Sequence, residues 1–158
     1  MSNNTGAIAE GPAHTLSEQE LAVWGGFLRT HSKLIRTLDA ELVDEHELPL
    51  SSYEVLLYLA NGPEEGMRMS ELADSVLLSR SGLTRLADRL ETAGLIVRRE
   101  CKSDQRGLLA VITDEGRRTF EEARRTHLAG VRERFLSRLS DAEQRMLGEI
   151  WERLLRPA

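Results

Sequence analysis

Hydroxyl groups and arginines recur on one side of a helix predicted over residues 79–94. Its inner face is an apolar stripe at spacings of three and four residues, formed by Leu83, Leu86, Ala87 and Leu90. At about 100° per residue, Ser81 and Arg85 point away from that stripe. Thr84 and Arg89 lie on its flanks. Such donors on the outer face of a helix suit the base edges and phosphates of a DNA major groove. Taken alone, the same helix is equally well explained as an amphipathic helix with a solvated charged face.

A basic hairpin is predicted directly after this helix. Branched apolar residues at 95–100 and 108–112 favour two strands, and they flank a seven-residue loop at 101–107. Arg98 and Arg99 precede the loop, and Lys102 and Arg106 lie within it. A basic hairpin beside a helix that lies in a major groove can reach phosphates or the adjacent minor groove. The order of helix, turn, helix and basic hairpin points to DNA much more strongly than either part alone.

The helices that must position this segment are predicted from their caps. Ser17 and Glu20 form a capping box before a long helix that runs to about residue 45, and Ser51 and Glu54 form a second box before a helix that ends near residue 61. Ser70 is a candidate N-cap for the first helix of the helix-turn-helix. Gly94 ends the second helix, because glycine readily takes a positive φ.

Two further helices are predicted after the hairpin. Thr113 caps a helix with an apolar period that continues to about residue 138, and Ser140 and Glu143 form a third capping box before the last helix. The long first helix would run about 40 Å at 1.5 Å per residue. This exceeds the width of so small a domain, so part of its apolar face needs another chain. We therefore expect a homodimer joined through the terminal helices.

The segment 69–112 resembles the winged helix-turn-helix of the MarR family of bacterial transcriptional regulators. The wing of that family has an Asp-x-Arg tip, which stands here as Asp104-Gln105-Arg106. Residues 50–60 resemble the helix that precedes the family's helix-turn-helix, and residues 111–116 resemble its exit from the wing. The similarity covers roughly residues 17–155. It implies a two-fold dimer joined through the N- and C-terminal helices.

We therefore predict a mainly α protein with a winged helix-turn-helix, a two-stranded β-wing and a helical dimerisation region. Residues 1–15 are expected to be a mobile arm, and 16–155 a single MarR-like domain. Within it, 50–113 form the DNA-binding lobe, and 16–46 with 114–155 form the dimerisation region. The predicted function is transcriptional control at near-palindromic duplex DNA. Repression by blocking polymerase, released when a ligand alters the spacing of the two recognition helices, is the simplest form.

Each DNA-binding side chain receives a role in this prediction. Those expected to face base edges are Ser81, Thr84 and Arg85. Those expected to hold phosphates are Arg80, Arg89, Arg98, Arg99 and Lys102. Arg106 is expected in the minor groove, oriented by Asp104, and Ser70 is placed with the DNA-binding residues. Asp88, which would oppose phosphate, is expected to pair with Arg85 or Arg89 or to accept from a cytosine amine.

An effector site is also implied by the resemblance. Members of the family bind small aromatic or acidic ligands between the dimer helices and the DNA-binding lobe. Trp24, Phe27 and His31 share one face of the long helix, so these three residues are candidates for its lining. An aromatic cluster with a hydrogen-bonded histidine is the alternative interpretation of the same residues.

Composition and charge narrow the classes of protein to which this chain can belong. The net charge is −5, yet residues 68–106 carry eight basic and six acidic side chains, which leaves −7 for the rest of the chain. A basic patch on an acidic body is compatible with binding a polyanion. No apolar run reaches the ~20 residues that span a bilayer, and the first residues lack the pattern of a secretory signal. With one cysteine, a cytoplasmic protein is expected.

Catalytic and cofactor motifs are absent from the sequence. There is no phosphate-binding glycine loop, no His-Glu-x-x-His, and no Cys-x-x-Cys. The four histidines lack metal-ligand spacing, so neither an enzyme nor a metal site nor a cofactor is expected.

Two alternative functions stay open. Cys101 has Arg98, Arg99 and Lys102 close in sequence, and positive neighbours favour a thiolate, so an oxidant-sensing regulator is one alternative. An incidental cysteine is the simpler interpretation. The other alternative is a helical dimer that binds a protein partner and no DNA. The steep salt dependence of DNA binding would separate it from the rest.

Overall fold

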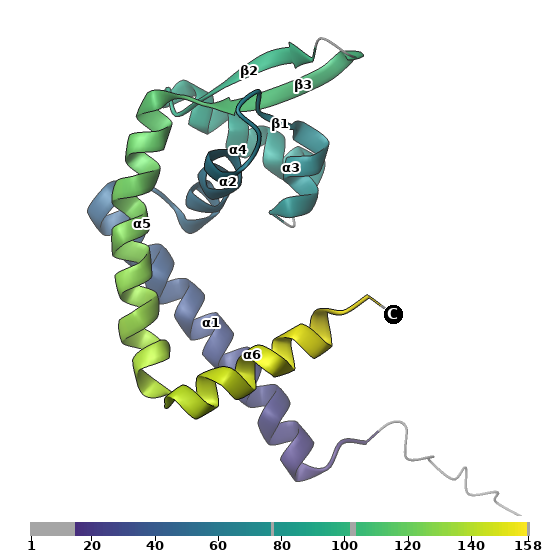
Figure 1. The fold of residues 1–158 in the computed structure, drawn as a ribbon, viewed down its shortest axis with the longest axis vertical. Coiled ribbons are helices and arrows are strands. Elements are labelled where there is room, and N and C mark those ends of the chain that lie inside the picture. The colour runs from purple at the N-terminus through teal and green to yellow at the C-terminus, as the bar shows by residue number, and fades with distance from the viewer. Residues whose placement is uncertain (1–14, 77, 102–103, 158) are drawn as a thin grey trace, which may run out of the picture. The chain divides into compact units, whose positions relative to one another are not determined.

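The computed structural model describes residues 15–76, 78–101 and 104–157, with the backbone alone at 101 and 104–106. Two compact units, Met1–Lys33 and Leu34–Ala158, meet in the middle of the first helix. The first unit contributes only the opening half of helix α1 (Glu18–His46) to the described residues. The second unit contains every other element and the core, and Figure 1 shows its helices and sheet.

Helix α1 begins where its sequence predicts. The backbone N–H of Ser17 donates to a Glu20 carboxylate oxygen at 2.7 Å, and the Glu20 N–H donates to Ser17 Oγ at 3.3 Å. This is the predicted capping box. The Ser17 N–H and the Ser17 hydroxyl both donate to the Glu20 carboxylate, and these two bonds lower the pKa of Glu20. The same reciprocal pair joins Ser140 and Glu143 at the start of α6 (Asp141–Leu155).

The second predicted capping box is wrong. Helix α2 (Leu50–Asn61) begins one residue before Ser51, and its N-cap, Pro49, makes no side-chain hydrogen bond. Asp39 of α1 supplies the acceptor instead, because its carboxylate receives the Leu50 N–H at 2.8 Å. Ser52 is buried at this end of the helix. An orphan N–H at a helix start needs an acceptor, but that acceptor need not be local in sequence.

The sheet contains one strand more than predicted. Strand β1 (Met67–Arg68) pairs with β3 (Asp104–Ile112), and β3 pairs on its other side with β2 (Ile96–Cys101). Both pairings are antiparallel, with Met67 opposite Ala110 and Ile96 opposite Ile112. Only residues 102–103 separate β2 from β3, so the predicted seven-residue loop is wrong. Cys101 pairs with Asp104 after a register shift between Glu100 and Cys101, so the backbone pairing continues beyond the predicted strand ends.

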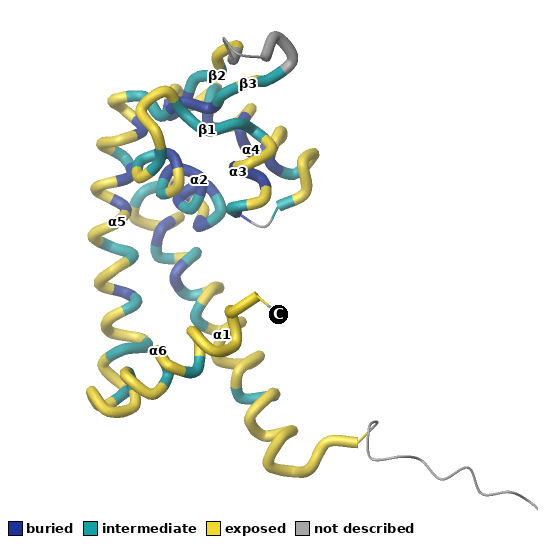
Figure 2. Tube along the Cα trace, turned by 45° about the vertical axis from the view of Figure 1, so that its right-hand side comes forward, coloured by how far each residue is buried: buried dark blue, intermediate teal, exposed yellow. Residues whose placement is uncertain are grey.

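Helices α3 (Met69–Ser75) and α4 (Arg80–Thr92) pack with α2 beneath this sheet (Figure 1). The core that joins them has its largest fully buried side chains at Leu42, Leu56, Leu72, Leu83, Ile96 and Val55. Figure 2 shows the buried residues gathered where these elements meet. The mainly helical fold with a small antiparallel wing is therefore confirmed.

Helix α5 (Asp114–Arg134) packs on this core through Phe120 and Ala123. It starts at Thr113, whose Oγ accepts the Gly116 N–H at 3.0 Å. It ends four residues before the predicted end, and a 3₁₀ turn, η2 (Leu136–Arg138), follows. The side-chain amide of Gln144 in α6 donates to the carbonyls of Leu136 and Leu139. These bonds satisfy the backbone of the turn, so the chain can leave the helix there.

Candidate nucleic-acid interface

The candidate site is built on helix α4, and the burial of its inner face fixes its orientation. Its buried residues are Leu83, Leu86, Ala87 and Leu90, the stripe predicted from the sequence. This stripe packs into the shared core. The face of α4 opposite this stripe is therefore turned away from the core.

Both ends of α4 are capped locally. Ser79 Oγ accepts the Gly82 N–H at 3.1 Å at the first turn. At the last turn Gly94 has φ +73°, its N–H donates to Glu91 O, and the Leu95 N–H donates to Leu90 O, each at 2.9 Å. This pair of bonds is a Schellman motif, as Gly94 predicted. The caps define where the helix starts and where the wing begins.

The end of α4 is also held by α5. Thr113 donates through its hydroxyl to Gly94 O at 2.7 Å and through its N–H to Leu95 O at 3.0 Å. Gly116 packs so closely that an added Cβ would lie 2.0 Å from Leu95 O. The start of α5 and the end of α4 are thus in direct backbone contact.

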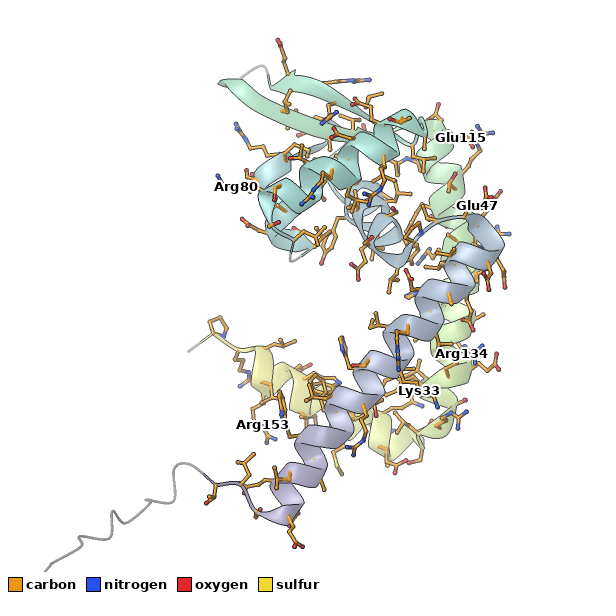
Figure 3. All side chains as sticks on the ribbon, turned by 180° about the vertical axis from the view of Figure 1, so that it is seen from behind. Lys33, Glu47, Arg80, Glu115, Arg134 and Arg153 are labelled. Carbon is orange, nitrogen blue, oxygen red and sulfur yellow. The ribbon has the colours of Figure 1, made fainter. Side chains whose placement is uncertain are left out.

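The outer face of α4 presents the side chains predicted to read DNA. Ser81, Thr84, Arg85 and Arg89 are all exposed. Thr84 Oγ1 donates to Arg80 O at 2.9 Å, and Arg85 Nε lies 3.4 Å from Ser81 O. These bonds stay within α4, so both side chains remain on its outer surface. Figure 3 shows Arg80 at the first turn of the helix.

Ser70 does not cap α3, contrary to the prediction. The N-cap is Arg68, whose backbone N–H donates to a Glu71 carboxylate oxygen at 3.4 Å. Ser70 is exposed in the first turn and lines a surface hollow with Arg80 and Thr84, over Met69 and Leu83. The structure therefore brings Ser70 next to the start of α4.

Arg98 has partners that the sequence analysis did not assign to it. Its Nη2 lies 2.8 Å from Asp88 Oδ1 and 2.5 Å from Glu91 Oε2, and its Nε donates to the same Glu91 oxygen at 2.9 Å. Its backbone N–H donates to Glu91 Oε1 at 2.9 Å. Asp88 therefore pairs with Arg98 of the wing, not with Arg85 or Arg89. The Arg98 guanidinium is thus bound to two carboxylates of α4, and its expected role in holding phosphate stays a prediction.

The electrostatics of this cluster follow from the same bonds. The hydrogen bonds from the Arg98 side chain and backbone lower the pKa of Glu91. The bond to Glu91 is also the main reason that the pKa of Arg98 is raised. Both side chains are thus held in their charged forms.

The rest of the wing is partly described. Arg99 is exposed on β2 opposite Leu109. The side chains of Cys101, Lys102, Asp104 and Arg106 lie outside the described residues, and their predicted roles stay predictions.

The aromatic residues of the expected effector site form a ladder on α1. The Trp24 and Phe27 rings are stacked with centroids 5.8 Å apart, and the Phe27 and His31 rings are 6.0 Å apart. All three side chains are exposed. An open hollow at this end of α1 includes Trp24 with Leu16, Glu20 and Val23. The ladder is therefore a surface aromatic face, and its role in ligand binding is untested.

Sequence reasoning missed His127. It lies on α5 with its ring centroid 4.7 Å from that of Tyr53 in α2. Its Nδ1 is buried and has no hydrogen-bond partner among the described residues, and burial lowers the pKa of His127. His127 follows Phe120 by seven residues, or two helical turns, so the sequence indicates that it lies on the core face of α5. The sequence does not show which of its ring nitrogens is left without a hydrogen bond.

The described part of the chain contains no group of three or more His, Cys, Asp or Glu residues placed to hold a metal ion. None of the helices in these same ranges has the length and apolar content that crossing a bilayer requires.

Known proteins resemble this chain in both sequence and fold. A sequence model of the MarR family matches residues 46–107, which span α2 to the wing. The HTH-type transcriptional repressor MdtR of Bacillus subtilis (strain 168) is 31% identical over 129 residues, which cover 79% of this chain and 81% of MdtR.

Two solved structures extend the comparison. The MarR family regulator Sco3205 from Streptomyces coelicolor, in complex with DNA, has a TM-score of 0.85 at 33% identity, covering 91% of this chain and 96% of Sco3205. CouR from Rhodococcus jostii RHA1, bound to p-coumaroyl-CoA, has a TM-score of 0.74 at 28% identity, covering 89% and 97%. The winged helix-turn-helix described above and these similarities place the chain in one family: it belongs to the MarR family of transcriptional regulators.

Proposed function

We propose that this protein is a ligand-responsive transcriptional repressor that binds near-palindromic operator DNA as a homodimer. The observation that carries the proposal is the outer face of α4, where Ser81, Thr84 and Arg85 are exposed on a helix fixed by its buried stripe. Hydroxyl and guanidinium donors of this kind bind base edges in the major groove. The complex of Sco3205 with DNA supports the same use of the fold.

Phosphate contacts are assigned to the basic residues around this face. Arg80 and Arg89 lie on α4 and Arg99 on the wing, all exposed, and Lys102 is added from the sequence. Ser70 lines the hollow beside Arg80, which supports assigning its hydroxyl to a phosphate oxygen. Arg106 is proposed for the minor groove, with Asp104 orienting its guanidinium. Arg98 is withdrawn from the phosphate contacts because Asp88 and Glu91 hold it.

The homodimer is proposed from exposed apolar surface at both ends of the chain. On α1 the side chains of Leu21 and Trp24 are each 54% exposed, and on α6 those of Leu154 and Leu155 are 66% and 81% exposed. A protein of this size rarely leaves so many large apolar side chains in water. A second copy would cover them and would place two recognition helices for two half-sites.

Ligand response and repression are the finer parts of the proposal. CouR was solved with p-coumaroyl-CoA, and MdtR is a repressor. An aromatic or acidic effector is proposed here, with Trp24, Phe27 and His31 as candidate contacts. Regulation of transcription in the cytoplasm, rather than catalysis, is the role that this assignment gives to the chain.

The test begins with fragments selected from the source genome by the purified protein. Sedimentation should give twice the 17.8 kDa chain mass, and fluorescence anisotropy should give tight binding to a selected palindrome. Four phosphates neutralised by basic side chains per protomer, eight per dimer, predict that log K falls with log salt at a slope of about −7. Affinity should then drop by about four decades between 50 and 200 mM salt. A folded dimer without salt-sensitive binding to any fragment would contradict the proposal and favour a protein partner.

A further inference from the structure

A single side chain of the wing is bound by two carboxylates of the recognition helix. Asp88 and Glu91 lie three residues apart on α4, and both contact Arg98 Nη2 of β2, at 2.8 and 2.5 Å. Glu91 uses its second oxygen for the Arg98 backbone N–H at 2.9 Å. The strand is thus held to the helix by its backbone as well as by its side chain.

The three side chains of this ion-pair cluster are exposed to solvent to different degrees. The side chains of Arg98, Glu91 and Asp88 are 23%, 36% and 54% exposed. Charge-assisted hydrogen bonds between a guanidinium and a carboxylate are shorter and stronger than neutral ones, and the partial burial of the Arg98 side chain reduces screening by salt. Two carboxylates next to each other repel unless a cation lies between them, and Arg98 is in that position. Asp88, Glu91 and Arg98 are called the wing clamp below.

We propose that the wing clamp fixes the orientation of the wing relative to the recognition helix, and that Arg98 is a positioning residue for DNA binding and not a phosphate contact. This inference rests on the proposed function. When α4 lies in the major groove, the hairpin must already point at the flanking DNA. The clamp supplies that preorganisation, so the wing loses less conformational freedom on binding.

Neutralising Glu91 distinguishes the two roles by the sign of its effect. If Arg98 contacts phosphate, Glu91→Gln removes a negative charge near the DNA and releases the guanidinium, so binding tightens. If the clamp positions the wing, Glu91→Gln loosens the hairpin and binding weakens. Arg98→Met, which keeps an apolar stem of similar reach but removes every side-chain donor, weakens binding in both cases.

The experiment compares Glu91→Gln, Arg98→Met and their double variant with wild type on one selected operator. Arg99→Met is the matched comparison for loss of charge, because it removes the same charge from the adjacent, exposed position of β2. Since Arg99 is itself a proposed phosphate contact, this variant should also weaken binding, and it serves as the control for hydrogen exchange of β2 rather than for Kd. Kd is measured well below the unfolding temperature, with the folded fraction verified by circular dichroism, so that a merely stabilising role would leave Kd unchanged. Each clamp variant is expected to weaken binding about tenfold, and the double variant no more than either one.

Two further measurements locate the effect. Hydroxyl-radical footprints of the clamp variants should lose protection at the outer positions contacted by the wing, while the positions protected by α4 remain. Without DNA, hydrogen exchange of the β2 amides should be faster in both clamp variants and unchanged in Arg99→Met.

Tighter DNA binding by Glu91→Gln, or losses of affinity that add in the double variant, would overturn the proposed positioning role of the wing clamp. Failure of wild type to bind any fragment would overturn the proposed function instead. The exchange rates still decide the clamp in that case, because unchanged β2 exchange in both clamp variants would contradict it without DNA.

Discussion

The carboxylate of Asp39, in the C-terminal half of α1, accepts the backbone N–H of Leu50 at the first turn of α2, at 2.8 Å. Eleven residues separate this acceptor from the helix start that it caps. The bond ties the C-terminal half of α1 to the DNA-binding lobe. It also places a negative charge where the positive end of the helix dipole favours one.

Asp39→Ala should therefore destabilise the protein by about 1 kcal/mol, the usual loss for a helix cap. Ser51→Ala is the matched control, because Ser51 is the residue whose pattern predicts the cap and α2 begins without it. It should change the free energy of unfolding by less than about 0.5 kcal/mol. Chemical denaturation of the two variants measures both values, and a larger loss at Ser51 would reverse the assignment.

Arg85→Ala tests base reading by α4. Arg85 is exposed on the outer face of the helix, so its loss should cost about 1–3 kcal/mol and relax preference at one base position per half-site. Arg89→Ala, on the flank, should weaken all operator variants about equally. Binding to a panel of single-base operator variants separates the two patterns. A uniform loss for Arg85→Ala would make Arg85 a phosphate contact.

Gly116→Ala tests the contact between α4 and α5. The added Cβ would lie 2.0 Å from Leu95 O and 2.9 Å from Ile112 Cγ1, so backbone must move and roughly 2–4 kcal/mol of stability should be lost. Gly148→Ala is the control, since nothing lies within 4 Å of its added Cβ. Because Gly148 lies in the interior of α6, Gly148→Ala should raise the free energy of unfolding by about 0.5–1 kcal/mol, measured by thermal unfolding. A loss at Gly148 would indicate that a second copy packs there.

His127 should make stability depend on pH. Burial lowers its pKa from the ordinary 6.5, against the opposing charge of Glu41. The unfolded chain therefore binds the proton more readily, and stability is lost as pH falls through 6.5 toward the lowered folded pKa. The neighbours on the facing side are Tyr53, whose pKa burial raises, with Arg124 and Glu121 beside it.

His127→Leu should flatten this loss of stability as the pH falls below the ordinary histidine pKa of 6.5. Burial raises the pKa of Glu54, and a raised carboxyl pKa adds stability as pH falls, so the total slope mixes both groups. Glu54 is present in both the wild type and His127→Leu. The difference between their pH dependences of stability is therefore due to His127. Urea denaturation at several pH values gives that difference, and equal slopes would mean that His127 is not the titrating group.

Local signals predicted the elements well. Ser17 with Glu20, Ser140 with Glu143, and Gly94 have partners within a few residues, so their caps could be read from the sequence. The stripe of α4 was predicted because burial follows a helical period. The outer face of the same helix followed from that stripe.

The errors concern partners that are distant in sequence. Leu50 is capped by Asp39, β1 pairs across some forty residues with β3, and Arg98 bonds to Glu91 across a turn. Charge and spacing assigned Arg98 to phosphate, because a sequence shows a cation but not the carboxylate folded against it. The carboxylates of the wing clamp were visible only as acidic residues on a basic helix.

Because Gly116 contacts the backbone of Leu95, a movement of α5 is transmitted directly to the end of α4. A helix of 21 residues is about 32 Å long at 1.5 Å per residue. The first turn of α5 contacts the end of α4, so a tilt of α5 by about five degrees about this contact displaces its far end by nearly 3 Å. Conversely, a displacement of that size at the far end of α5 rotates its first turn against α4. An effector that tilts α5 would therefore turn a recognition helix that it never touches.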